Sequence, residues 1–88
     1  MIKDIVYLES DRNYITLTTV KGKFSFIDAL KNWIEKLPSN GFTQVHKSYI
    51  INQEFVDKIS GNEVFVDGHK IPIGRTFKKE LLTTLNIS

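Results

Sequence analysis

The feature that most limits the fold of this chain is the short spacing between its β-type segments. Residues 63–66 and 69–73 contain β-branched and aromatic side chains and are separated only by Asp67-Gly68. An Asp-Gly pair accommodates the positive φ angles of a two-residue hairpin turn. Neighbouring parallel strands need a crossover of about a dozen residues, which is longer than this connection. The sequence therefore predicts antiparallel strands joined by tight turns.

Further strands are expected wherever β-branched and aromatic residues form short runs between polar residues. These runs are residues 2–8, 14–19, 42–46, 49–51, 55–56 and 58–59, with a weaker signal at 23–24. Pro72 lacks an N–H group, which predicts that the strand at residues 69–73 lies at a sheet edge.

Two segments instead have the residue spacing of a helix with one apolar face. The first is expected to begin at the capping-box-like Ser25-x-x-Asp28 and to stop at residues 38–41. Its apolar face is expected to consist of Phe26, Leu30, Trp33, Ile34 and Leu37. The second helix follows Gly74, and its apolar face is expected to consist of Phe77, Leu81, Leu82 and Leu85. The predicted fold class is thus mainly β with two short helices.

The chain offers few groups for catalysis or metal binding. It has 88 residues, which fits a single domain, and no cysteine, so it has no thiol nucleophile, thiolate zinc site or disulfide. The sequence also lacks the common nucleophile-elbow, zinc-peptidase and phosphate-loop motifs. His46 and His69 are far apart and have no carboxylate at metal-ligand spacing. We expect a protein that is not an enzyme and that holds neither a cofactor nor a metal.

No membrane or secretion signal is visible in the sequence. The longest apolar runs, such as residues 49–51, are far shorter than the roughly 20 residues of a bilayer-spanning helix. The first residues do not resemble a signal peptide, and there is no disulfide framework. A cytoplasmic location without membrane contact is expected.

Three polar stretches rich in hydrogen-bond donors interrupt the β pattern. They are residues 11–14, 46–48 and 74–79, and the last belongs to a basic C-terminal region in a chain of formal net charge +2. Arg, Lys, His and Asn side chains reach base edges, whereas Ser, Thr, Tyr and Lys suit phosphate oxygens. If the fold brings these stretches together, they form a basic surface suited to nucleic acid.

Two other interpretations of the same residues remain open. The basic side chains of residues 75–79 also fit the solvated start of an amphipathic helix, and His46 fits a hydrogen-bonded strand residue. In that case the chain is a β-rich module for protein interaction or dimerisation that does not bind nucleic acid. RNA binding is a further alternative, because stacked bases need aromatic rings, which could be supplied by Tyr14, Phe24, Tyr49 and Phe65.

Three longer stretches resemble the LytTR DNA-binding domain. They are Tyr7-Leu8-Glu9-Ser10-x-x-Asn13-Tyr14, Phe42-x-x-Val45-His46-Lys47-Ser48-Tyr49-Ile50-Ile51-Asn52 and Ile71-Pro72-Ile73-Gly74-Arg75-x-Phe77-Lys78. Their order and spacing also match, and together they cover most of the chain. This family is the output domain of LytR/AlgR-type response regulators of bacterial two-component systems, where it usually follows a receiver domain. The resemblance implies one elongated antiparallel β domain over residues 1–88, at the C-terminal end of a longer regulator.

The resemblance also implies sequence-specific binding of double-stranded DNA in transcription regulation, by loops that enter successive major grooves. It places the base contacts at Asn13, His46, Lys47 and Arg75. We expect the contacts to the DNA backbone from Arg12, Tyr14, Ser48, Lys78 and Lys79. Relatives tend to bind paired direct repeats, so the implied partner is promoter DNA and the implied active form is a dimer on it.

Two departures from the family pattern bear on these expectations. Gln44 stands where relatives commonly carry an arginine, which removes an expected phosphate contact. The family also has a strand ahead of the segment at residues 2–8, and almost nothing precedes that segment here. We therefore expect an exposed sheet edge, which favours pairing between chains.

Overall fold

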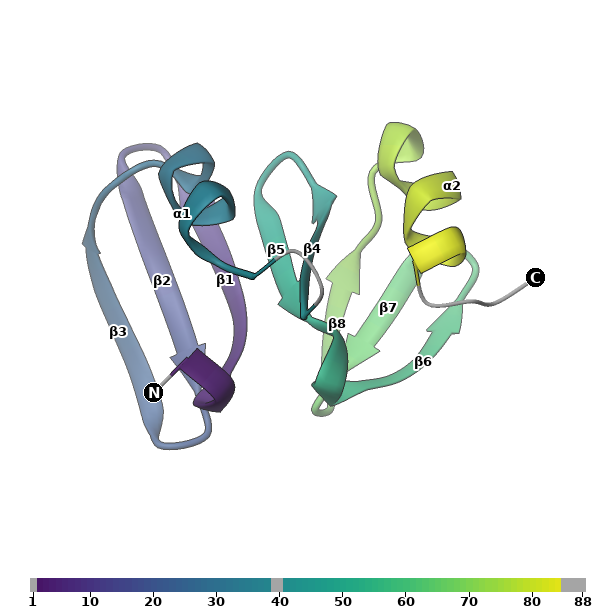
Figure 1. Cartoon of the computed structure of the whole chain (residues 1–88), viewed down its shortest axis with the longest axis horizontal. Helices are drawn as coiled ribbons and strands as arrows, with labels where there is room; N and C mark the ends of the chain where they lie inside the picture. The colour runs from purple at the N-terminus through teal and green to yellow at the C-terminus, as the bar shows by residue number, and fades with distance from the viewer. Residues whose placement is uncertain (1, 39–40, 85–88) are drawn as a thin grey trace.

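The structure is a computed structural model that describes residues 2–38 and 41–84, and Figure 1 shows it as a ribbon. Within these residues the chain forms eight strands, two α-helices and two short 3₁₀ helices. The strands are β1 (Ile5–Asp11), β2 (Tyr14–Thr19), β3 (Gly22–Ile27), β4 (Phe42–His46), β5 (Tyr49–Asn52), β6 (Val56–Ser60), β7 (Glu63–Val66) and β8 (His69–Pro72). The helical elements are η1 (Ile2–Asp4), α1 (Leu30–Lys36), η2 (Gln53–Phe55) and α2 (Arg75–Thr84).

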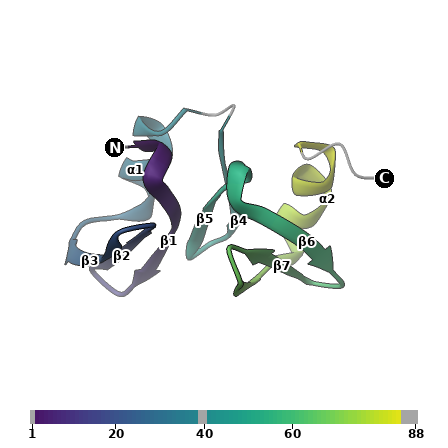
Figure 2. The same ribbon diagram turned by 90° about the horizontal axis from the view of Figure 1, so that it is seen from below.

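The strands form two antiparallel sheets. The larger sheet has the order β3-β2-β1-β5-β4, and the smaller sheet has the order β6-β7-β8. Helix α1 covers one face of the larger sheet, while the smaller sheet and α2 pack against part of the opposite face (Figure 1, Figure 2). The molecule is elongated, with extents of 36, 25 and 22 Å along its principal axes. The predicted fold class, mainly β and antiparallel with two helices, is confirmed.

Strand β1 lies at the centre of the larger sheet and is buried on both faces. The side chains of Ile5 and Leu8 belong to the core beneath α1, whereas those of Val6 and Tyr7 belong to the core shared with the smaller sheet. A bulge between Ile5 and Tyr7 accompanies this change of face. A continuous apolar run is typical of a strand that is covered on both sides. Since each fully buried aliphatic side chain contributes about 1.5–3 kcal/mol, β1 is a main anchor of the fold.

The open edge of the larger sheet does not lie beside β1, because β1 is hydrogen-bonded to β2 on one side and to β5 on the other. The outer strands are β3 and β4. Strand β4 is bridged to the start of α2, since the Gly74 N–H donates to the Val45 carbonyl at 2.7 Å. Strand β3 has no neighbour beyond it among the described residues, and its Phe24 and Ile27 side chains are 55% and 73% exposed. The exposed edge is therefore β3.

Helix α1 begins later than the sequence predicts. Ser25 and Phe26 lie in β3, where Ser25 is opposite Thr16 and the two hydroxyl oxygens are 3.1 Å apart. The Phe26 ring lies 5.6 Å from the Trp33 ring, so it joins the core beneath α1 from a strand and not from the helix. The predicted capping box is wrong, because pairing with β2 holds these residues extended although their spacing also fits a helix.

The turns are as predicted. Asp67 and Gly68 have φ angles of 49° and 81°, which confirms the tight β7–β8 hairpin. Pro72 lies in β8, which is an edge strand of the smaller sheet, as its missing N–H requires.

Two further elements differ in their bounds. Phe55 belongs to η2 and not to a strand, because the Asn52 side chain accepts a hydrogen bond from the Glu54 N–H at 3.0 Å and caps that turn. Helix α2 begins at Arg75, and Leu85 of its expected apolar face lies outside the described residues. Between residues 2 and 38 and between 41 and 84, no helix is long and apolar enough to cross a membrane.

Asp28 holds the start of α1. Its Oδ1 accepts hydrogen bonds from Asn32 Nδ2 at 2.9 Å and from the Ala29 N–H at 2.8 Å, and its Oδ2 accepts one from Trp33 Nε1 at 3.0 Å. These hydrogen bonds, above all the one from Asn32, hold the pKa of the Asp28 carboxyl below its ordinary value of 3.8, although desolvation acts in the opposite direction. The Asp28 N–H donates to the Asn13 carbonyl at 3.0 Å, so this residue also links α1 to the β1–β2 turn.

Substituting Asp28 by asparagine should lower the melting temperature at neutral pH, and the deficit should shrink in acid. A carboxyl group whose pKa is lowered by folding contributes stability above its unfolded pKa, which is the ordinary value of 3.8, and loses it as the pH falls through the folded value. Thermal melts of the wild type and Asp28→Asn between neutral pH and about pH 2.5 test this expectation. A deficit that stays constant over this range would contradict a role for the charge.

Candidate nucleic-acid interface

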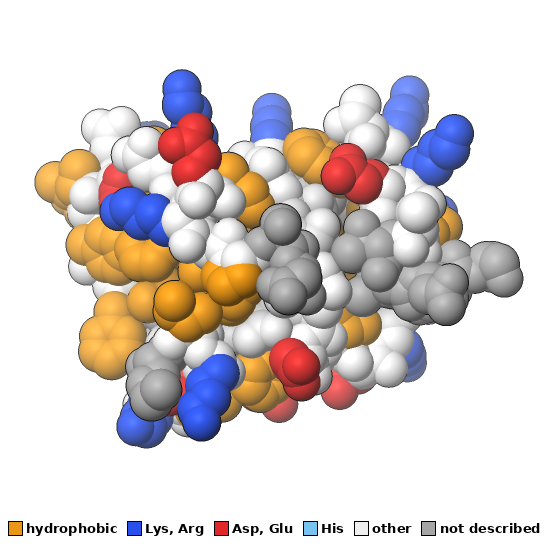
Figure 3. Space-filling model, in the orientation of Figure 1, with side chains coloured by type: hydrophobic (Ala, Val, Ile, Leu, Met, Phe, Trp, Pro, Cys, Tyr) orange, Lys and Arg blue, Asp and Glu red, His pale blue; other side chains and the backbone are white. Residues whose placement is uncertain are grey.

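Three turns lie at the same end of the molecule, the upper end in Figure 1. They are the β1–β2 turn, the β4–β5 turn and the β8–α2 junction, and with their flanks they comprise residues 12–14, 46–48 and 74–79. We call this end the turn edge. Figure 3 shows Lys and Arg side chains projecting along it, although basic side chains also occur at the lower left. The fold therefore brings together all three polar stretches, and with them all nine residues that the sequence nominates for DNA contact.

Backbone hydrogen bonds join neighbouring turns. The Ser10 N–H donates to the Ser48 carbonyl at 2.8 Å, which connects the β1–β2 hairpin to the β4–β5 turn. The bond from the Gly74 N–H to the Val45 carbonyl connects the β8–α2 junction to β4. Because these bonds join main-chain atoms at strand ends, they fix the separation of the turns more closely than flexible side chains would.

The β1–β2 turn presents three exposed side chains. These belong to Arg12, Asn13 and Tyr14, and the pairing of Asp11 with Tyr14 closes the hairpin beneath them. Arg12 has a φ angle of 59°, a left-handed conformation that costs an L-amino acid about 1–2 kcal/mol. The turn thus holds a cation and an amide at its tip, accessible to a ligand.

In the β4–β5 turn, His46 is held by its own chain and Lys47 is exposed. His46 Nδ1 accepts a hydrogen bond from the Ser48 N–H at 3.1 Å, and the His46 ring meets the Tyr49 ring edge to face at 5.5 Å. Nε2 is then the other polar atom of the ring, and it is a donor when the ring is neutral. The Gln44 side-chain amide donates to the His46 carbonyl at 3.1 Å, so the residue that departs from the family pattern supports the turn. His46 is therefore both a hydrogen-bonded strand end and part of the turn edge.

The first turns of α2 carry the remaining cations. Arg75 and Lys79 are exposed, whereas Lys78 is half-buried and its Nζ donates to Asn62 Oδ1 at 3.1 Å. The junction thus presents two accessible cations, and a third that is hydrogen-bonded to the β6–β7 turn.

Gly74 allows the junction to pack closely against the β4–β5 turn. A methyl group at this position would lie 2.9 Å from Phe77 Cδ2 and 3.5 Å from His46 Cα. The first of these distances is below a van der Waals contact, so any larger residue must displace the Phe77 ring or the start of α2. The glycine therefore sets the spacing of two of the three turns.

Several residues support or extend the turn edge in ways that the sequence analysis did not predict. Glu9 and Tyr49 form a hydrogen bond beneath two of the turns, but they are 40 positions apart in the chain. Lys31 is exposed in the first turn of α1, which the bond from Asp28 to Asn13 holds beside the β1–β2 turn. A lysine on a solvated helix face carries no pattern, so only the tertiary fold identifies it.

The aromatic residues considered for RNA stacking do not form one platform. Tyr14 and Phe24 lie on opposite faces of the larger sheet, and Tyr49 packs against the core between the sheets. Phe65 lies on the smaller sheet, where Lys58 Nζ is 4.9 Å from the centre of its ring. For the part of the chain that the structure describes, no group of three or more His, Cys, Asp or Glu side chains is placed to hold a metal ion.

The family model of the LytTr DNA-binding domain matches residues 1–86 of this chain. The chain belongs to the LytTR family. A solved LytTr DNA-binding domain from Bacillus cereus has the same fold as this LytTR domain, with a TM-score of 0.85 over 98% of this chain and 84% of that chain. The two sequences are 16% identical, so this comparison concerns the fold alone.

Curated relatives of this LytTR domain include sensory transduction proteins of several bacteria. LytT of Bacillus subtilis is 33% identical over 91 residues, which cover 97% of this chain and 38% of that protein. LytT of Bacillus anthracis is 34% identical over 92 residues, covering 98% of this chain and 37% of that protein. LytR of Streptococcus mutans is 30% identical over 91 residues, covering 96% of this chain and 37% of that protein. This chain therefore spans less than two-fifths of the length of these relatives.

Replacing Gly74 by alanine should destabilise this LytTR domain by about 1–3 kcal/mol, because the added methyl group overpacks the junction. Gly41→Ala is the matched control, since a methyl group at Gly41 would meet no atom within 4 Å. Urea unfolding of the two variants and the wild type measures the difference.

A smaller side chain at residue 77 should relieve the overpacking caused by Gly74→Ala. The double variant Gly74→Ala/Phe77→Leu should therefore lose less free energy of unfolding than the sum of the losses in the two single variants. Equal stability of the Gly74→Ala and Gly41→Ala variants would contradict the close packing at the junction.

Proposed function

We propose that this LytTR domain binds double-stranded DNA in a sequence-specific manner through the turn edge, as the DNA-binding part of a transcription regulator. The observation that carries the proposal is the convergence of three donor-rich turns, joined by backbone hydrogen bonds, at one end of the molecule. Membership of a family of DNA-binding domains supports DNA as the ligand. Relatives named as sensory transduction proteins, and one named as a transcriptional regulatory protein, support the regulatory role.

The turn edge is suited to DNA reading by turns and not by a recognition helix. Only the start of α2 belongs to the edge, and its Leu81 is buried in the core. The major groove returns to the same side of B-form DNA about every 34 Å. The turns follow one another along the longest axis of the molecule, whose extent is 36 Å. The row of turns runs along this axis and is shorter than the whole molecule. This arrangement suits turns that enter successive major grooves on one side of a duplex.

The chemistry of the exposed side chains suggests how the bases are read. The Asn13 amide can pair with adenine through N6 and N7, and the Arg75 guanidinium can pair with guanine through O6 and N7. His46 and Lys47 can donate to purine acceptors in the major groove. The proposed backbone contacts, which position the domain on the duplex, come from Arg12, Tyr14, Ser48, Lys78 and Lys79.

We propose further that two copies bind paired direct repeats in promoter DNA in the cytoplasm. A second copy that makes the same contacts on a second repeat would extend the recognised site along the DNA. Neither a cofactor nor a catalytic group is needed for this function.

Self-association through β3 is the second candidate function. The open edge of β3 and its exposed Phe24 and Ile27 side chains favour it. Unpaired backbone groups on an edge strand can pair with another chain. In that case the basic turns are incidental, and the domain does not bind duplex DNA.

Replacing Arg75 by alanine should weaken binding to the cognate duplex by about 1–3 kcal/mol and binding to a scrambled duplex much less. Arg75→Lys keeps the charge but cannot donate two parallel hydrogen bonds to one guanine, so it should also lose specificity. The cognate duplex is selected from a random library with the wild-type chain, and competition gel shifts compare the two duplexes.

Two outcomes would contradict this reading in different ways. If the wild type neither selects nor shifts any duplex, the proposed function is wrong and self-association is favoured. If Arg75→Ala weakens both duplexes equally, Arg75 is a phosphate contact and not a base contact.

Replacing Lys78 and Lys79 by glutamine should reduce the magnitude of the slope of log association constant against log salt concentration by about two. Each phosphate contact that is lost no longer releases counterions on binding. The ranking of duplexes by affinity should not change. Gel shifts at several salt concentrations measure the slope.

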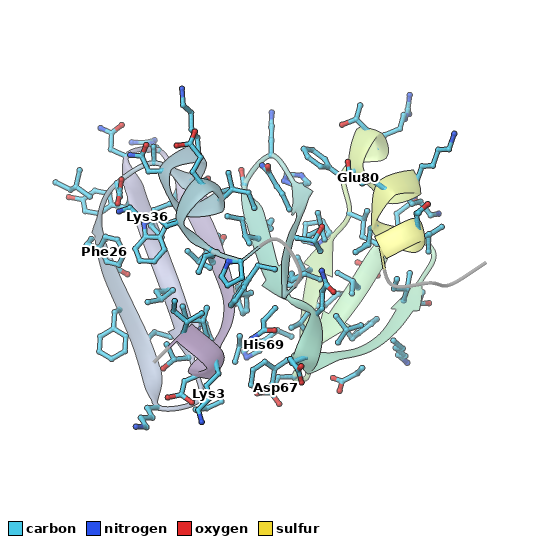
Figure 4. The ribbon with its side chains drawn as sticks, viewed as in Figure 1. Lys3, Phe26, Lys36, Asp67, His69 and Glu80 are labelled. Carbon is cyan, nitrogen blue, oxygen red and sulfur yellow. The ribbon has the colours of Figure 1, made fainter. Side chains whose placement is uncertain are left out.

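The matched control neutralises Lys3 and Lys70 at the opposite end of the molecule. Figure 4 labels Lys3 there, and Lys70 follows the labelled His69 in β8. An equal change in slope for the two double variants would show that only net charge matters.

A further inference from the structure

The strand ends beneath two of the three turns are joined by a side-chain hydrogen bond. Glu9 in β1 and Tyr49 in β5 are opposite each other in the register of the larger sheet. The Tyr49 hydroxyl donates to Glu9 Oε2 at 3.1 Å, and both residues are half-buried. Tyr49 directly follows the β4–β5 turn, and Glu9 lies just before the β1–β2 turn. The bond therefore spans the same two turns as the backbone bond from Ser10 to Ser48.

Tyr49 also contacts His46, one of the residues proposed to read bases. The two residues are paired across the β4–β5 turn, and their rings meet at an interplanar angle of 72°. Aromatic rings in an edge-to-face arrangement attract each other. Since the hydroxyl bond to Glu9 restrains the Tyr49 ring, it also restrains the place of the His46 ring.

The electrostatics of the pair favour a lasting hydrogen bond. Burial, and then the hydrogen bond to Glu9 and the charge of its carboxylate, raise the pKa of the Tyr49 hydroxyl above its ordinary value of 10.0. The hydroxyl therefore stays protonated and remains a donor. The bond also restrains a negative charge that would otherwise be free to approach DNA phosphates.

We propose that Tyr49 and Glu9 are positioning residues for DNA reading, whose hydrogen bond sets the relative placement of the β1–β2 and β4–β5 turns and the orientation of His46. This inference rests on the proposed function. It adds two residues that determine specificity without contacting DNA.

Two substitutions at Glu9 separate the hydrogen bond from the charge. Glu9→Asp keeps the charge, but its side chain is one methylene shorter and withdraws from Tyr49. Glu9→Gln removes the charge but keeps an oxygen that accepts at the same place. The ratio of affinities for the selected and the scrambled duplex should fall about tenfold in Glu9→Asp, which is the scale of one lost hydrogen bond. In Glu9→Gln, where an acceptor remains in place, the ratio should stay within about twofold of the wild type. Tyr49→Phe, which breaks the bond from the other side, should behave like Glu9→Asp.

Amide hydrogen exchange without DNA gives a readout that does not depend on binding. The Ser10 N–H donates to the Ser48 carbonyl and the Ser48 N–H donates to His46 Nδ1, so both amides report on the placement of the turns. Both should exchange faster in Glu9→Asp and Tyr49→Phe, and at the wild-type rate in Glu9→Gln.

Three outcomes would overturn the inference while the proposed function stands. The first is an unchanged affinity ratio in both Glu9→Asp and Tyr49→Phe. The second is an equal loss of affinity for both duplexes in Glu9→Asp and Tyr49→Phe, together with a lower melting temperature, because this would show that the hydrogen bond only stabilises the fold. The third is a loss of the ratio in Glu9→Gln but not in Glu9→Asp, because that assigns the effect to the charge. If the wild type itself shows no preference between duplexes, the proposed function fails first.

Discussion

Strand β1 is paired with β2 and β5 and is covered by α1 on one face and by the smaller sheet on the other. Its register with β5 is specified at both ends. At one end the buried Asn52 side chain donates to the Ile5 carbonyl at 2.7 Å, and at the other the Ser10 N–H donates to the Ser48 carbonyl. A buried amide that loses its partner costs about 1–3 kcal/mol, so a shift in register would be penalised. The placement of the turn edge thus follows from how β1 is built into the sheet.

Much of the fold could be predicted because its signals are local. The Asp67-Gly68 turn and the edge position of Pro72 depend on the conformational limits of those residues themselves. The start of α1 could not be predicted in this way, because Phe26 fits both a helical spacing and a strand, and only its pairing with β2 decides between them. A local sequence pattern therefore predicts structure reliably where those residues can adopt only one backbone conformation.

The candidate site shows the same division. The sequence identified the polar stretches and their residue types, but their convergence depends on hydrogen bonds between distant segments, such as Ser10 with Ser48 and Gly74 with Val45. Lys78 was expected to be available in the same way as Lys79, whereas it donates to Asn62 from the β6–β7 turn. No pattern within the α2 segment could reveal that partner.

The open edge of β3 has a consequence for how the domain behaves in solution. Lys21 and Lys23 are exposed beside this edge, and positive charges on an edge strand repel a second copy that approaches to pair with it. Salt screens such repulsion over a Debye length of about 10 Å at 0.1 M, while the apolar side chains of Phe24 and Ile27 remain exposed. Contacts with phosphates weaken as salt rises. Under the proposed function, ionic strength therefore acts in opposite senses on the two parts of the molecule. The buffers that would weaken phosphate contacts at the turn edge are those in which β3 is least protected from aggregation.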